Sequence, residues 1–378
     1  MYIVRAIVGV LALVTALCAG LPVTAARADT AWHPGLLLSA EPLDREWGGL
    51  DDVQRIGYVT TGPGGKLVAA EAVVRIPDGA APEGGWRVLA WDHGTSGVGQ
   101  QCGLTGSPQL ERETGPVVRR LNDAGYAVVA PDYIGLSPGS PGPHPYLQTS
   151  TAATATIDAV RATRDAFAGL STAWGAVGFS QGGHAALGTG RYAPEYAPEL
   201  DFRGTVALSP VSNMETVFLR SRPDQPEMPG FPGRAVAMVL SGMTGGAVNV
   251  NIDDYLTPAG RNLVGELNTA CNSGTAEMLG HAEIGHLVAR PLDDSEFGPA
   301  MRRYMSVPVS GYQDPILVVH GTYDTVVPLP FTLALTGQFV KNGTQHDLSI
   351  IQAGHDDLPE HGGLDRAVAF FGQVLPPR

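Results

Sequence analysis

The chain has 378 residues, of which 44% are hydrophobic and 16% are charged. This composition allows a large buried core and excludes a chain that is disordered throughout. The formal net charge is −13, and no basic stripe interrupts it, so we expect no nucleic-acid partner. The length fits two or three domains, or one large α/β domain that carries an insertion.

The first 28 residues have the pattern of a secretory signal peptide. Arg5 precedes an apolar run over residues 6–21, and an Ala-Arg-Ala cleavage site ends at Ala28. The alternative is a membrane anchor, but glycines and a proline interrupt the run, which is also short for a bilayer span. We therefore predict that residues 1–28 are a signal peptide, cleaved near Ala28, and that the mature protein is secreted.

Cleavage at this site removes Cys18 and leaves two cysteines, Cys102 and Cys271. In a secreted protein, two cysteines most simply pair in a disulfide, and the alternative is two buried thiols. Two cysteines alone do not make a structural zinc site, and the sequence has no H-E-x-x-H motif. The cysteine pattern therefore predicts a disulfide and no metal.

Strand-like and helix-like segments alternate along the chain. The expected strands are 55–60, 67–76, 87–91, 126–130, 173–178, 205–209, 316–320 and 348–352. The expected helices are 115–123, 150–167, 181–190, 331–340 and 363–374. Because the strands after the first pair are almost continuously apolar and alternate with helices, we predict an α/β protein whose mostly parallel sheet has helices on both faces.

This alternation stops between residues 211 and 313. The stretch holds helical pieces around 234–240, 258–269, 275–288 and 296–304, and it is too long for a loop. We predict a helical insertion at 211–313, flanked by a first core part at 29–210 and a second at 314–378. All seven methionines after the initiator lie in the insertion, where they suit either a surface for varied apolar partners or ordinary core packing.

Residues 178–182 read Gly-Phe-Ser-Gln-Gly and match G-x-S-x-G, a motif that places serine on a sharp turn between a strand and a helix. Ser180 follows an expected strand and opens an expected helix, and Gln181 has an N–H that can bind an oxyanion. Gly178 and Gly182 leave room for the tight turn. A second match contains Ser137, but a proline without an N–H follows it, so we interpret Ser137 as a surface-loop serine.

A serine nucleophile needs a base within hydrogen-bond reach and an acid that orients the base. Asp324 follows the strand 316–320, and His355 follows the strand 348–352, at the sheet edge where open parallel sheets bind ligands. We predict Ser180, Asp324 and His355 as the catalytic residues. Alternatives are a turn-capping role for Asp324 and His346 or His361 as the base.

A second oxyanion donor is expected in the loop after the strand 87–91, where residues 92–97 read Asp-His-Gly-Thr-Ser-Gly. We predict the Thr95 N–H as this donor, with Gly94 as the alternative, and we interpret His93 as a residue that orders the loop. Nucleophile, base and oxyanion donors are then all protein groups, so we expect no cofactor.

In this order, Gly-Phe-Ser-Gln-Gly, the run His-Gly-Thr-Tyr-Asp at 320–324 and Gly-His at 354–355 resemble the α/β-hydrolase superfamily. The His-Gly-Thr-Ser-Gly loop with Cys102 nearby, the run Ala-Pro-Asp-Tyr-Ile-Gly at 130–135 and the helical insertion resemble the secretory lipase family. The resemblance extends from about Arg87 to the C-terminus. It implies an α/β-hydrolase fold in which the insertion acts as a lid, and hydrolysis of carboxylic esters, often acylglycerols.

Other functions on this fold stay open. A serine peptidase or an acyltransferase would use the same three residues, although a prolyl peptidase usually carries a large N-terminal domain, and only residues 29–86 precede the strand before the oxyanion loop. A non-catalytic binding protein usually lacks one of the three residues, and none is missing here. We therefore predict a monomeric serine hydrolase that cleaves small-molecule or lipid esters, with transient contact between the lid and a lipid surface.

Overall fold

The structure is a computed structural model that describes residues 31–43, 46–140, 142–223, 231–246, 248–279 and 284–377. The predicted signal peptide and Met228 lie outside these residues. From Trp32 onward the chain clusters as one unit. No helix in the described ranges has the length and apolar character that a membrane-spanning segment needs.

In the described chain, nine strands form one mixed sheet in the order β1-β2-β3-β5-β4-β6-β7-β8-β9. They are β1 (Leu37–Pro42), β2 (Gln54–Thr61), β3 (Leu67–Arg75), β4 (Trp86–Asp92), β5 (Tyr126–Pro131), β6 (Leu170–Phe179), β7 (Asp201–Leu208), β8 (Ile316–Gly321) and β9 (His346–Ile351). The pairs from β1 to β5 are antiparallel, and those from β5 to β9 are parallel. The mostly parallel sheet predicted from the sequence is confirmed.

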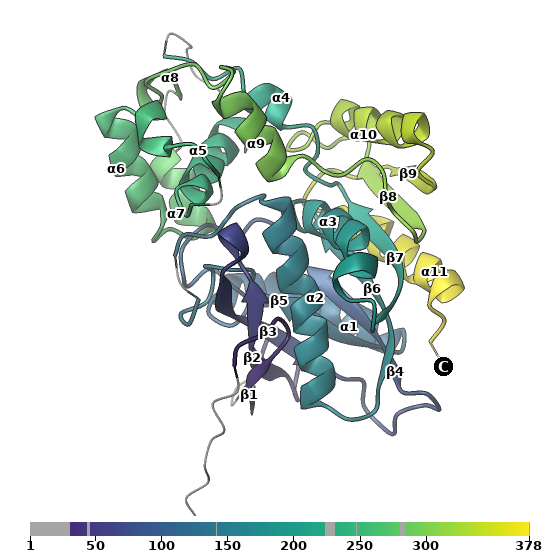
Figure 1. Ribbon diagram of the computed structural model, residues 1–378. Helices are drawn as coiled ribbons and strands as arrows, with labels where there is room; N and C mark the ends of the chain where they lie inside the picture. Colours follow the sequence, from purple (N-terminus) through teal and green to yellow (C-terminus); the bar gives the residue numbers. More distant parts are fainter. Residues whose placement is uncertain are drawn as a thin grey trace, which may run out of the picture. The chain divides into compact units, whose positions relative to one another are not determined.

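Helices cover both faces of this sheet (Figure 1). Alternate side chains of β4 show the two layers: Val88 and Ala90 pack in the cluster of α2 and α3, whereas Leu89 and Trp91 pack in the cluster of α1 and α11. Strands buried on both faces have no polar side, which explains their continuous apolar sequences. The helices around the sheet are α1 (Pro108–Asp123), α2 (Thr149–Ala166), α3 (Gln181–Tyr196), α10 (Leu329–Asn342) and α11 (Leu364–Val374).

Two predicted elements differ from the structure, and one strand was missed. Helix α1 begins at Pro108, not at residue 115, because the Ser107 side chain accepts a hydrogen bond from the Leu110 amide and caps the helix. Strand β1 was not predicted. The run 348–352 was predicted as a buried strand, but β9 is the edge of the sheet, and Leu348 and Ile350 are 36% and 46% exposed.

Between β7 and β8 the described residues form a group of helices at one end of the sheet (Figure 1). These helices are α4 (Glu215–Phe218), α5 (Phe231–Met243), α6 (Pro258–Leu267), α7 (Asn272–Leu279), α8 (Ile284–Leu287) and α9 (Phe297–Met305). The predicted piece 275–288 therefore corresponds to two helices, α7 and α8, and residues 280–283 between them lie outside the description.

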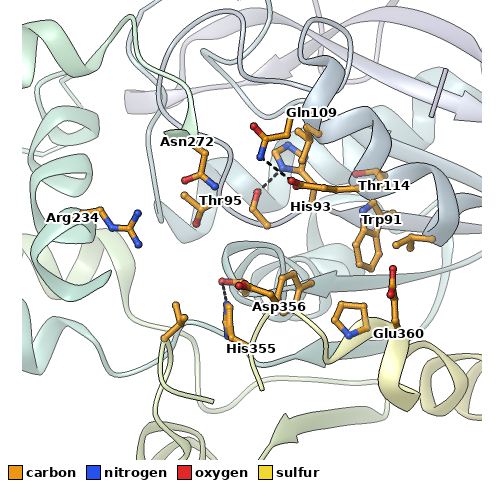
Figure 2. Close-up of a pocket in the computed structure, with 18 of the residues that line it drawn as sticks. Trp91, His93, Thr95, Gln109, Thr114, Arg234, Asn272, His355, Asp356 and Glu360 are labelled. Carbon is orange, nitrogen blue, oxygen red and sulfur yellow. Dashed lines mark hydrogen bonds between the residues drawn. The ribbon is translucent and has the colours of Figure 1, made fainter. Parts of the chain in front are cut away.

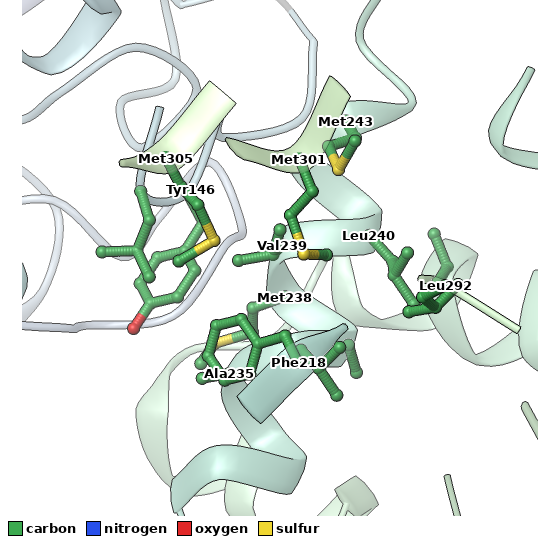
Figure 3. Packing of buried hydrophobic residues seen from close by; sticks show 14 of the residues in the cluster. Tyr146, Phe218, Ala235, Met238, Val239, Leu240, Met243, Leu292, Met301 and Met305 are labelled. Atoms are coloured by element: carbon green, nitrogen blue, oxygen red, sulfur yellow. The ribbon is translucent and has the colours of Figure 1, made fainter. Parts of the chain in front are cut away.

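The helical group has its own hydrophobic core. Five of its methionines are buried there, namely Met214, Met238, Met243, Met301 and Met305. Figure 3 shows four of them among the side chains of this core, with Met305 beside Tyr146. Met278 is 40% exposed. Core packing therefore accounts for most of the described methionines, which decides between the two roles that the sequence left open.

A disulfide joins Cys102 to Cys271, as predicted, with 5.1 Å between the Cα atoms. The backbone beside it is paired as well, because the Val98 N–H donates to the Ala270 carbonyl at 3.2 Å and the Asn272 N–H donates to the Ser96 carbonyl at 2.8 Å. The segment before α7 is thus fastened to the loop that follows β4.

Candidate active site

The turn between β6 and α3 holds Ser180 in a strained conformation with φ of +56°, in the left-handed region that non-glycine residues rarely adopt. The turn needs glycine on both sides. A Cβ on Gly178 would lie 2.1 Å from the Gly182 carbonyl oxygen, and a Cβ on Gly182 would lie 1.8 Å from the Asp92 carbonyl oxygen. Both predicted elbow glycines are therefore required by close backbone contact.

The structure brings the three predicted side chains into one hydrogen-bonded chain. His355 Nε2 lies 2.9 Å from Ser180 Oγ, and His355 Nδ1 lies 2.7 Å from Asp324 Oδ2. All three residues are buried. Because a carboxylate only accepts hydrogen bonds, Nδ1 carries the proton, and the free Nε2 lone pair faces the serine hydroxyl. This is the tautomer in which a histidine can take a proton from serine.

Asp324 is held in its ionised form. Burial raises the pKa of this carboxyl group, but the hydrogen bond and the charge of His355 and the bond from the Val327 amide outweigh burial, so its pKa lies below the ordinary value. The amides of Val326 and Val327 donate to Asp324 Oδ1 at 3.0 and 2.8 Å. One carboxylate oxygen therefore caps the turn after β8 while the other holds His355, so the turn-capping alternative is compatible with an orienting role.

The two alternative bases, His346 and His361, have other hydrogen-bond partners, and so has His184, which the sequence indicates is a packing residue. The first residue of β9 is His346, and its Nδ1 contacts the Thr344 carbonyl. The exposed His361 side chain contacts the Asp357 carbonyl. His184 lies in α3, and its two ring nitrogens contact Thr149 and the Val211 carbonyl. In the described structure, none of these rings has a hydrogen bond to Ser180.

Ser137 is not a surface residue, so that interpretation was wrong. Its side chain is fully buried, and in the described structure its hydroxyl has no hydrogen-bond partner. The turn that carries Ser137 packs closely against the backbone at His144, because a Cβ on Gly135 would lie 2.6 Å from the His144 backbone nitrogen. Ser137 still differs from the elbow serine, because the residue that follows it is a proline, which has no N–H to stabilise an oxyanion.

The loop after β4 lies beside the elbow. His93 is buried, and its Nδ1 contacts the Gly94 carbonyl at 2.7 Å. Burial lowers the pKa of His93 to about 4, so the ring is neutral near pH 7. The Thr95 hydroxyl shares a hydrogen bond with the Tyr146 hydroxyl at 2.9 Å, which fixes this side chain at the cavity wall. Both predicted donors, Thr95 and Gly94, line the cavity with Ser180.

His144 supports the elbow from behind, and the sequence analysis missed it. Its Nδ1 lies 2.8 Å from the Ile134 carbonyl, so Nδ1 carries the proton and Nε2 accepts a bond from Gln181 Nε2 at 2.8 Å. Burial lowers the pKa of His144 to about 3, so this pattern persists near neutral pH. The ring also stacks on Tyr133, which in turn contacts His93. One hydrogen bond and two aromatic contacts thus connect Gln181, the residue after Ser180, with the loop after β4.

Asp92 is the last residue of β4, and its backbone packs against the elbow glycine Gly182. It is fully buried, and its Oδ1 accepts a hydrogen bond from the Thr156 hydroxyl at 2.6 Å. Burial raises the pKa of Asp92 to about 8, although the Thr156 bond opposes this. The side chain is therefore mostly protonated near pH 7 and does not act as a second orienting acid.

A cavity of about 540 Å³ opens onto Ser180 and His355. Its apolar side chains include Trp91, Leu110, Val117, Phe179, Met238 and Val326, and its polar ones include Thr95, Gln109, Glu113, Arg234, Asn272 and Asp356. In Figure 2, Trp91, Thr95 and Gln109 come from the core, whereas Arg234 and Asn272 come from α5 and α7. In the described residues, no group of three or more His, Cys, Asp or Glu side chains is arranged to hold a metal ion.

The chain matches the family model described as secretory lipase over residues 107–361. It therefore belongs to the secretory lipase family, as its motifs predicted. A curated relative is a probable inactive lipase of Mycobacterium tuberculosis, which is 26% identical over 230 residues. The match covers 58% of this chain and 48% of the relative, so the chain spans about half the length of that protein.

Solved structures share the fold. The rice cell wall degrading esterase LipA from Xanthomonas oryzae superposes with a TM-score of 0.71 at 22% identity, covering 90% of this chain and 98% of that one. Candida antarctica lipase A in its closed state gives 0.70 at 18% identity, covering 91% and 82%. The predicted α/β-hydrolase fold is confirmed.

Proposed function

We propose that this protein is a secreted serine hydrolase that cleaves carboxylic esters through an acyl-enzyme. Ser180 is the nucleophile, His355 is the general base, and Asp324 keeps His355 in the required tautomer. The observation that carries the proposal is the hydrogen-bonded chain from Asp324 through His355 to Ser180, at distances of 2.7 and 2.9 Å, on the wall of a 540 Å³ cavity.

The reaction follows from these positions. As the Ser180 oxygen bonds to the ester carbonyl carbon, its proton passes to His355 Nε2, and the amides of Gln181 and Thr95, or of Gly94, stabilise the oxyanion. The imidazolium then gives this proton to the leaving alcohol, and the acyl group stays on Ser180. Water then enters, loses a proton to His355, and its oxygen bonds to the acyl carbon. As the bond between this carbon and the Ser180 oxygen breaks, His355 returns the proton to Ser180 and the carboxylic acid leaves. No metal or organic cofactor is needed for any of these steps.

The helical insertion at 211–313 is proposed as the lid of this site. Met238 of α5 and Asn272 of α7 line the cavity, which supports a role of the insertion in contacting the substrate. The proposed substrate is an acylglycerol or another acyl ester, and a lid of this kind can touch a lipid surface transiently. The proposed active form is a monomer.

Export is proposed from the pattern of residues 1–28. The disulfide between Cys102 and Cys271 supports this, because such bonds form and persist mainly in oxidising compartments outside the cytosol.

Labelling with a fluorophosphonate tests the function, because this reagent bonds to an activated serine. The mature wild-type protein should gain one covalent adduct and release 4-nitrophenol from short-chain 4-nitrophenyl esters, whereas Ser180→Ala should do neither. Wild-type protein that is folded, unlabelled and inactive on every ester would refute the proposal and indicate a binding protein. That outcome would agree with the relative that is named as inactive.

A further inference from the structure

One charged side chain in the cavity has no role in the proposed ester hydrolysis. Arg234 lies in α5, and among the described residues that line the cavity it is the one Lys or Arg. Figure 2 shows its guanidinium group directed from α5 into the cavity, on the side of Thr95 and Asn272. A long cationic side chain usually extends to solvent, so the direction of Arg234 into the cavity suggests a role there.

Arg234 is also without a counter-ion in the part of the chain that the structure describes. No hydrogen bond or ion pair joins it to a described carboxylate, although other arginines, such as Arg161 and Arg290, pair with acidic residues. The side chain is partly buried. A cation that is partly removed from water and unpaired is stabilised when an anion binds beside it.

The polar groups near Arg234 can complete such a site. The Tyr146 hydroxyl is close enough for the charge of Arg234 to oppose the effect of burial, which raises the pKa of Tyr146. Tyr146 in turn shares a hydrogen bond with Thr95. Asn272 lines the same wall and carries a side-chain amide. A carboxylate bound by the guanidinium therefore has hydroxyl and amide donors within the same part of the cavity.

The acidic lining residues give the cavity a direction. Glu360 lies at the opposite end from Arg234, and Asp356 lies next to His355 (Figure 2). A carboxylate on the substrate is repelled at the acidic end of the cavity and attracted at the Arg234 end. The arrangement thus favours one orientation of an ester that carries a carboxylate.

We propose that Arg234 binds a carboxylate carried by the ester substrate, so that the site prefers half-esters of dicarboxylic acids, or esters of hydroxy acids, over neutral esters of the same length. Guanidinium is suited to this role because its planar N–H groups can bind both carboxylate oxygens. The overall charge of −13 does not oppose it at short range, since salt screens surface charges over about 8 Å at physiological ionic strength. The inference names a substrate class for the proposed serine hydrolase and rests on that function.

Matched substrates test the preference. In the first series, the monoethyl esters of succinic, adipic and suberic acid are each compared with the ethyl ester of the fatty acid that has the same number of acyl carbons. In the second, butanoyl esters of hydroxy acids are compared with butanoyl esters of the matching alkanols. Proton release in a pH-stat gives kcat/KM for each, and the readout is the ratio of the anionic to the neutral ester.

The wild type should prefer the anionic member in at least one pair, and Arg234→Gln should lower that ratio by about tenfold, the effect expected for one charge-assisted hydrogen bond. Arg234→Lys should restore part of the ratio, and added salt should reduce it in the wild type. Arg303→Gln is the matched control, because Arg303 is exposed on α9 and does not line the cavity.

The outcomes separate the two proposals. If the wild type cleaves neutral esters and Arg234→Gln leaves every ratio unchanged, the carboxylate site is refuted while the serine hydrolase stands. If the wild type cleaves no ester and no fluorophosphonate adduct forms, the proposed function itself fails. A ratio that falls equally in Arg303→Gln would also overturn the assignment to Arg234.

Discussion

Replacement of His144 by phenylalanine should impair the chemical step of ester hydrolysis, although His144 does not line the cavity. Phenylalanine keeps the ring that stacks on Tyr133 but removes the acceptor for Gln181 Nε2, now 2.8 Å away. Gln181 is buried, and in the described structure its Oε1 already lacks a partner. The whole Gln181 side chain would then be unpaired, and its backbone, which carries the proposed oxyanion N–H, would lose its fixed position.

The magnitude follows from this contact. A buried donor left unpaired costs about 1–3 kcal/mol, and part of that appears in stability rather than in catalysis. If about 1–2 kcal/mol is lost from the transition state, kcat falls about 5- to 30-fold. Complete loss of one oxyanion donor, about 10²–10³-fold, is the upper limit. KM should change little, because His144 does not line the cavity.

The assay measures kcat and KM on a soluble short-chain ester, together with the affinity for a boronic acid that mimics the tetrahedral intermediate. His184→Phe is the control, since His184 is another buried histidine whose two ring nitrogens have hydrogen-bond partners, and neither partner is Gln181. Gln181→Leu should show a similar loss, and the double variant with His144→Phe should lose little more. Folded His144→Phe protein with wild-type kcat and boronate affinity, or fully additive losses, would refute the reasoning.

Four further outcomes are expected. Ser180→Ala should abolish ester turnover while Ser137→Ala retains most of it, and equal losses would overturn the choice of nucleophile. Asp324→Asn should lower kcat by about four orders of magnitude, because the wrong histidine tautomer is then favoured; full turnover in that variant would require another orienting acid. Burial raises the pKa of Asp92 to about 8, so the folded state holds a proton that the unfolded state releases near pH 4, and stability falls as the pH rises between these values. Asp92→Asn should make the melting temperature less dependent on pH across that range, and an unchanged dependence would contradict the buried, protonated state. Reduction of the disulfide, whose cysteines are 169 residues apart, should lower stability by at most about 5 kcal/mol and slow turnover as well, whereas two free thiols in the secreted protein would exclude the bond.

Sequence patterns predicted the sheet and the groups at its strand ends because these depend on local signals. Apolar strand sequences alternate with helices, and the elbow requires glycines at fixed offsets, as the contacts of Gly178 and Gly182 show. Ser180, Asp324 and His355 each follow a parallel strand, and strand ends at one edge meet in space. Their catalytic roles remain predictions.

The buried polar residues behind the site were not predictable in the same way. His144 and Tyr133 lie in a loop, and their contacts depend on how distant segments pack, which no periodicity encodes. The error at Ser137 has the same origin, since a turn rich in glycine and proline is usually exposed, yet this one is enclosed. Arg234 is the one charged residue of the otherwise largely apolar helix α5, and the sequence does not show whether this side chain faces a cavity or solvent.

Two backbone hydrogen bonds and the disulfide join the loop after β4 to the helical group. The same few residues of this loop include the proposed oxyanion donor Thr95, Ser96 whose carbonyl accepts a bond from the Asn272 amide, Val98 whose amide donates to the Ala270 carbonyl, and Cys102 of the disulfide. A shift of the segment before α7 therefore pulls on the loop that shapes the oxyanion site as well as on Asn272 in the cavity wall. If the substrate contacts the helical group as proposed, we expect that contact to affect the proposed oxyanion site, and binding at Arg234 would then help to fix the loop after β4.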